Sequence, residues 1–159
     1  HGAEAELINA GVSGDTTAGG RARIDWTLTE EVDALIVALG GNDMLRAIDP
    51  ALTRENLDAI LSAAGAENVD VLLIGLEAPG NYGPDYKRAF DAIFPDLAEK
   101  HGALYLDSFF AGLPGDQPAD AARFMQADGI HPNAEGVERI VAGVGPKVLD
   151  LIDRAGEGG

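Results

Sequence analysis

A carboxylate and an imidazole lie three positions apart in the segment Asp128-Gly129-Ile130-His131. One tight turn across the glycine can bring the Asp128 carboxylate against a ring nitrogen of His131, which fixes the tautomer and stabilises the imidazolium that forms on protonation. A histidine held in this way can act as a general base near neutral pH. The alternative is a polar surface turn that caps the last helix at Asn133, and we favour that turn when the segment is taken alone.

Two glycine-containing segments could donate hydrogen bonds to an oxyanion. In Gly40-Gly41-Asn42-Asp43 the glycines let the backbone approach a ligand closely, and the Asn42 amide is expected to project from a strand end. In residues 11–16 the backbone N–H of Gly14 could donate in the same way. One preorganised donor of this kind lowers the barrier to acyl transfer by about 3 kcal/mol. The alternatives are an ordinary turn and a plain helix N-cap.

Short apolar runs alternate with longer stretches of helical period along the chain. The apolar runs predict strands at residues 5–8, 34–39, 69–76 and 103–106. Because each run is apolar nearly throughout, we expect an α/β fold with a three-layer, doubly wound parallel sheet. Three candidate segments follow predicted strands, where open α/β sheets place their ligand crevice.

Apolar residues at helical spacing predict the helices that cover this sheet. One helix should begin at Asp49-Pro50, a second should be kinked by Pro95, and the last should begin near Asn133 and bend or break at Gly145-Pro146. Trp26 is expected to pack in the core.

Length and composition predict a single domain. The chain has 159 residues, of which 46% are hydrophobic, so one domain over residues 1–155 can bury a core without disulfides. Residues 156–159 are glycine-rich and are expected to be a disordered tail.

The charge balance excludes several classes of partner. Lys and Arg number 11 against 27 Asp and Glu, a formal charge of -16, which argues against nucleic acid and anionic membrane surfaces. No apolar run approaches the roughly 20 residues of a membrane span. The absence of cysteine and the three scattered histidines argue against a zinc hydrolase, and we expect no metal and no organic cofactor.

Taken together and in this order, the segments around Gly14, Asn42, Asn81 and Asp128-His131 resemble the SGNH, or GDSL-type, serine hydrolases. The arylesterase and thioesterase/lysophospholipase branch is the most similar. The resemblance implies a five-stranded flavodoxin-like sheet, an oxyanion hole from Gly14 and Asn42, and an Asp128-His131 pair. It also implies that the loop with Asn81 and Tyr82 shapes the acyl pocket, although Gly-Asn-Tyr-Gly is an ordinary turn sequence too. Family members are often periplasmic or secreted.

The opening block of the family, with its first strand and nucleophilic serine, has no counterpart in these residues. Only six residues precede Leu7, and none is serine. Because that strand lies inside the family's sheet, its loss would leave backbone groups unpaired at about 1 to 3 kcal/mol each. We therefore expect a preceding segment, or another chain, to supply both the serine and an extended segment between residues 5–8 and 34–39.

The serines within the chain are weaker candidates for the nucleophile. Ser13 is expected beside the oxyanion glycine, not as the attacking group. Ser108 follows a strand but lacks the neighbouring glycine, and Ser62 lies on a predicted helix.

These observations lead to one main hypothesis and two alternatives. The main hypothesis is a serine esterase that hydrolyses short or medium acyl esters, namely aryl esters, thioesters or lysophospholipids, through an acyl-enzyme. The first alternative is a non-catalytic fragment or pseudo-enzyme that binds acyl ligands. The second is a flavodoxin-like domain that binds phosphate or nucleotide, although the chain lacks a glycine-rich phosphate loop.

Overall fold

The computed structural model describes residues 5–114 and 122–157. Its sheet contains β1 (Ala34–Val37), β2 (Asp70–Ile74) and β3 (Leu104–Leu106), which are all parallel and lie in the order β1-β2-β3. Ala34 lies beside Asp70, and Leu72 lies beside Leu104. The parallel α/β sheet agrees with the prediction.

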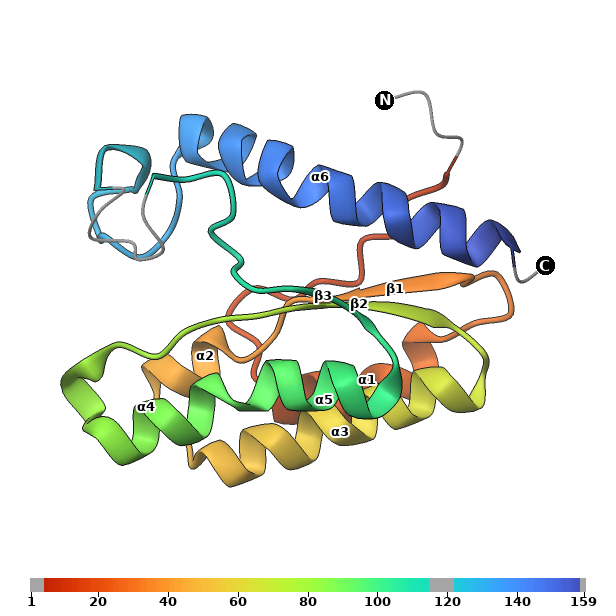
Figure 1. Ribbon diagram of the computed structural model, residues 1–159, viewed down its shortest axis with the longest axis horizontal. Coiled ribbons are helices and arrows are strands. Elements are labelled where there is room, and N and C mark those ends of the chain that lie inside the picture. The colour runs from red at the N-terminus through yellow and green to blue at the C-terminus, as the bar shows by residue number, and fades with distance from the viewer. Residues whose placement is uncertain (1–4, 115–121, 158–159) are drawn as a thin grey trace.

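Helices cover both faces of the sheet, which gives the expected three layers (Figure 1). One layer contains α1 (Thr17–Thr27), α3 (Pro50–Ala66), α4 (Pro84–Asp91) and α5 (Ile93–His101). The long helix α6 (Ala134–Glu157) lies alone on the other face. The short elements α2 (Gly41–Leu45), η1 (Gly80–Tyr82) and η2 (Ala122–Phe124) complete the described chain.

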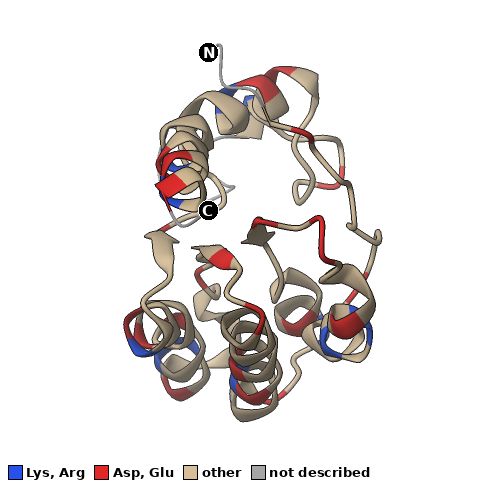
Figure 2. Ribbon diagram, turned by 90° about the vertical axis from the view of Figure 1, so that its right-hand side faces the viewer, with Lys and Arg blue, Asp and Glu red and all other residues tan. Residues whose placement is uncertain are grey.

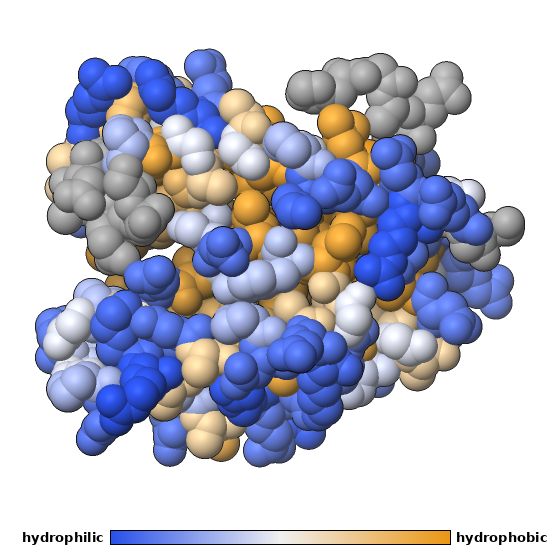
Figure 3. Space-filling model, viewed as in Figure 1, coloured by the Kyte–Doolittle hydropathy of each residue, from blue (hydrophilic) through white to orange (hydrophobic). Residues whose placement is uncertain are grey.

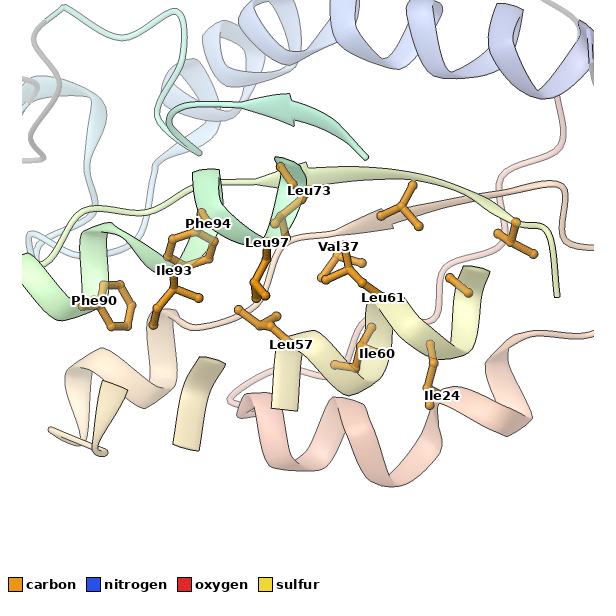
Figure 4. Close-up of a cluster of buried hydrophobic side chains, with 14 of the residues drawn as sticks. Ile24, Val37, Leu57, Ile60, Leu61, Leu73, Phe90, Ile93, Phe94 and Leu97 are labelled. Carbon is orange, nitrogen blue, oxygen red and sulfur yellow. The ribbon is translucent and has the colours of Figure 1, made fainter. Parts of the chain in front are cut away.

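The main core lies between the sheet and the four-helix layer (Figure 4). Leu57 and Ile60 of α3 and Phe94 of α5 are buried there against Leu73 of β2. On the other face, Leu72 packs with α6. The central strand is therefore buried on both sides, which explains its continuous apolar run.

Local sequence signals located two helix boundaries. Asp49 caps α3, since its side chain accepts a hydrogen bond from the Ala51 N–H, and Pro50 is the first helical residue. The expected kink is also present: α4 ends at Asp91 and α5 begins at Ile93. Pro95 causes this break because it has no N–H to donate to the carbonyl of Asp91.

Residues 5–8 do not form the predicted strand. They are irregular, and Leu7 is 86% exposed. An apolar run becomes a strand only where a neighbouring strand can pair with it. Within residues 5–114 and 122–157, no strand lies on the outer side of β1, and residues 5–8 do not pair with β1 either. The additional extended segment that we expected there is thus not found.

Three smaller predictions were wrong. Trp26 is 87% exposed, because α1 buries Ile24 and residues two apart point in different directions from a helix. Helix α6 continues through Pro146 without interruption, since a proline removes only one hydrogen bond of the helix ladder. The same helix reaches Glu157, so residues 156 and 157 are helical, whereas 158 and 159 lie outside the described residues.

A salt-bridge cluster between α3 and α5 predicts a pH-dependent stability. The Asp58 carboxylate accepts hydrogen bonds from Lys100 Nζ at 2.7 Å and lies 2.6 Å from His101 Nε2. The bonds from Lys100 and then His101 lower the pKa of Asp58 below its ordinary value of 3.8. This stabilisation is therefore present above the ordinary pKa and is lost as the pH falls through the folded-state value.

We expect Asp58→Asn to lower the free energy of unfolding by about 0.5 to 1 kcal/mol near neutral pH, as is typical of partly exposed ion pairs. Urea denaturation at a series of pH values measures this difference. It should shrink as the pH falls towards about 3, and a difference that stays constant over this range would contradict the assignment.

Candidate active site

The candidate residues gather where the strands end. β1 leads through Gly40 into α2, and β2 leads into the loop that contains η1. The segment with Asp128 and His131 lies at the same end of the molecule, on the α6 side (Figure 1). In the space-filling view an indentation separates the two layers at this left-hand edge (Figure 3).

Asp128 and His131 are in direct contact. The Asp128 Oδ2 atom lies 2.7 Å from His131 Nδ1, and Oδ1 accepts hydrogen bonds from the backbone N–H groups of His131 at 3.0 Å and Ile130 at 2.9 Å. The bonds from the His131 side chain and backbone, and from Ile130, hold the pKa of Asp128 far below its ordinary value. The carboxylate therefore stays ionised near neutral pH and can orient the imidazole.

The outer nitrogen of His131 is available for proton transfer. The His131 side chain is 66% exposed, and within the described parts of the chain no side chain forms a hydrogen bond with its Nε2 atom. Because Nδ1 faces Asp128, Nε2 is the nitrogen that can accept a proton from a nucleophile.

Asn133 holds the turn against α6. Its Nδ2 group donates to the carbonyl oxygens of Arg123 at 2.9 Å and Met125 at 3.2 Å, and its Oδ1 accepts the Gly136 N–H at 3.0 Å. The sequence predicted the cap on the helix but not the bonds to the preceding loop. Asn133 is thus a cap and also a support for the Asp128-His131 turn.

Gly14 occupies a turn that requires glycine. The Asp15 N–H donates to the Val12 carbonyl at 3.2 Å, and Gly14 has a φ of 76°. This left-handed conformation favours glycine because it has no Cβ. Thr16 then caps α1, since its hydroxyl accepts the Gly19 N–H. Both the turn and the cap that the sequence suggested are present.

Asn42 lies in the first turn of α2 and not at the strand end itself. Gly40 precedes this helix with a φ of 115°, and the Met44 N–H donates to its carbonyl at 2.9 Å. Asn42 is half-buried, and no hydrogen bond of its side-chain amide is found among the described residues. The amide can therefore donate to a ligand.

The loop with Asn81 and Tyr82 lies beside the residues that follow α2. The Tyr82 hydroxyl donates to the Leu45 carbonyl at 3.5 Å, and its ring lies 5.1 Å from the ring of Tyr86. Asn81 is exposed in η1. This loop therefore borders the Asn42 side of the site.

Two further residues connect Gly14 with Asn42, and sequence reasoning gave neither a role. Arg46 Nη2 donates to the Gly14 carbonyl at 3.0 Å. The Asp43 carboxylate is completely buried and accepts hydrogen bonds from Thr17. The structure thus brings the candidate residues together in two groups, Gly14 with Asn42 and Asp128 with His131.

None of the three serines contacts His131 in the described residues. Ser13 is exposed in the Gly14 turn, and Ser62 is exposed on α3. The Ser108 hydroxyl accepts the Phe110 N–H at 3.1 Å.

Other kinds of site find no support in residues 5–114 and 122–157. No group of three or more acidic or histidine side chains in this part could hold a metal ion. No helix there has the length and apolar character needed to cross a membrane. Acidic residues occur in both helical layers (Figure 2).

Residues 1–139 match the GDSL-like Lipase/Acylhydrolase family. The chain is 41% identical to esterase TesA of Pseudomonas aeruginosa over 147 residues, which are 92% of this chain and 71% of that protein. It is 34% identical to thioesterase 1/protease 1/lysophospholipase L1 of Escherichia coli over 148 residues, 92% of this chain and 69% of that protein. The crystal structure of AlinE4, an SGNH-hydrolase family esterase, superimposes with a TM-score of 0.71 at 42% identity and covers 92% of this chain and 76% of AlinE4.

Proposed function

Because this chain belongs to the GDSL-like lipase/acylhydrolase family and is an ester hydrolase, we propose that it is a serine esterase that works through an acyl-enzyme. Its substrates are short or medium acyl esters: aryl esters, thioesters or lysophospholipids. The observation that carries the proposal is the 2.7 Å contact between Asp128 and His131, which leaves Nε2 of the imidazole free.

The imidazole transfers the protons of the reaction. Nε2 of His131 takes the proton of a serine hydroxyl as the serine oxygen attacks the acyl carbon. It then gives this proton to the leaving oxygen or sulfur as the bond from the acyl carbon breaks. Water repeats the sequence on the acyl-enzyme, which releases the acid and restores the serine. Throughout, the ionised Asp128 stabilises the imidazolium.

The Gly14 N–H and the Asn42 amide stabilise the oxyanion of the tetrahedral intermediate. Gly14 is exposed, and the Asn42 amide is not engaged by the described residues. Donors that are already oriented need no reorganisation as the charge develops, so they lower the barrier and not only the binding energy. Asn81 and Tyr82 border the acyl group on the same side.

The nucleophilic serine comes from a segment that precedes His1, and the same segment adds a strand beside β1. Ser13, Ser62 and Ser108 lie away from His131. On the sheet side, β1 pairs only with β2 among the described residues, and Ile36 is 39% exposed. Apolar surface is also visible between α6 and the sheet (Figure 3). These features support a further strand in this position.

Labelling with a fluorophosphonate tests the proposal, because this reagent reacts only with an activated serine. We expect the intact mass of the complete protein to increase by one phosphonyl group, and we expect labelling to become much slower in His131→Ala. A complete protein that takes no label would instead favour the alternative of a non-catalytic acyl-binding protein.

A further inference from the structure

The carboxylate of Asp43 is fully buried, and the proposed chemistry gives it no task. It is 0% exposed, and no Lys or Arg forms an ion pair with it in the described residues. Its hydrogen bonds come from the Thr17 N–H at 2.9 Å, the Thr17 hydroxyl at 2.5 Å and the Thr53 hydroxyl at 3.4 Å. A buried charge without a cation is costly to retain, so its position calls for an explanation.

These bonds fasten the two proposed oxyanion donors to each other. Asp43 directly follows Asn42 on α2, whereas Thr17 begins α1 three positions after Gly14. The segments are therefore joined one residue from one donor and three residues from the other. Thr53 connects the same carboxylate to α3, and Asn56 of that helix donates to the Thr17 hydroxyl at 3.2 Å.

Arg46 makes a second connection on the exposed side. Its Nη2 atom donates to the Gly14 carbonyl at 3.0 Å, while its backbone N–H donates to the Asn42 carbonyl at 3.1 Å. One hydrogen-bonded contact would leave the Gly14 turn free to rotate about it. Two contacts on different sides of α2 restrict both the distance and the orientation of the turn.

On the basis of the function proposed above, we propose that Asp43 and Arg46 are positioning residues that set the spacing between the Gly14 N–H and the Asn42 amide. An oxyanion hole works because its donors are oriented before charge develops. A displacement of about 1 Å can therefore cost about 100-fold in rate. The loss should fall on kcat and not on KM, since these donors act mainly in the transition state.

The exposed Arg46 gives the cleaner test, because its replacement leaves the core intact. In the complete protein, Arg46→Gln should lower kcat for p-nitrophenyl butyrate about tenfold, with KM changed less than about twofold and the melting temperature unchanged. Arg54→Gln is the matched control. It removes another surface arginine, one that pairs with Asp96 at 2.8 Å on α3, and it should leave kcat unchanged.

Asp43 can be tested with an isosteric variant. In Asp43→Asn the remaining oxygen can accept the Thr17 N–H, and the new amide can donate to the threonine hydroxyls, so most of kcat should remain. Asp43→Ala removes both bonds to Thr17 and should lower kcat about 100-fold. If Asp43→Ala does not fold, Arg46→Gln and Asp43→Asn still decide the question.

A transition-state analogue separates positioning from general structural damage. For a trifluoromethyl ketone with the same acyl group, affinity should fall across these variants in proportion to kcat/KM. A normal kcat in Arg46→Gln, or a loss of analogue affinity that does not follow kcat/KM, would overturn the inference. If His131→Ala is inactive at the same time, the proposed function stands without it. Undiminished turnover in His131→Ala would overturn the proposed function as well.

Discussion

Replacement of His131 by alanine in the complete protein is expected to lower kcat for p-nitrophenyl butyrate by at least about 1000-fold. The variant loses the group that takes the serine proton and returns it to the leaving group. The turn should keep its shape, because Asp128 also accepts the backbone N–H groups of residues 130 and 131. Initial rates over a range of substrate concentrations, together with the melting temperature, measure the effect.

The chain offers a matched control for this variant. His101 also lies beside a carboxylate, 2.6 Å from Asp58, but it belongs to the salt-bridge cluster at the end of α5. His101→Ala should change stability slightly and leave kcat unaltered. Equal kcat values for wild-type protein and His131→Ala would refute the assignment of the general base.

Asn42→Ala is expected to produce the second largest effect, a loss of about 100-fold to 1000-fold in kcat with little change in KM. The variant removes one donor to the developing oxyanion. No hydrogen bond of the Asn42 side chain is seen in the described residues, so the melting temperature should remain the same. Steady-state kinetics and thermal unfolding of the same preparation test both statements.

Asn68→Gly serves as the control for the loss of an asparagine side chain. Asn68 is exposed in the turn before β2, and its φ of 58° is one that glycine adopts easily. This variant should retain full kcat. The oxyanion role would be rejected if Asn42→Ala were equally active, or if its loss appeared entirely in KM.

The sequence predicted the sheet where a signal was complete within one segment. β2 reads as a buried strand because both of its faces are covered, and α3 carries its own cap at Asp49 and Pro50. Prediction failed at residues 5–8 and at Trp26. In both cases the expectation depended on a partner, a neighbouring strand or a facing core, that local sequence does not specify.

The candidate site divides in the same way. The Asp128-His131 contact spans three positions, so one turn forms it, and the sequence alone was sufficient to predict it. Residues 26 and 32 positions apart meet where Asp43 binds Thr17 and where Arg46 binds Gly14. These contacts exist only because α1, α2 and α3 pack together at one end of the sheet. Side chains so distant in the chain acquire their common position from packing, which no local pattern encodes.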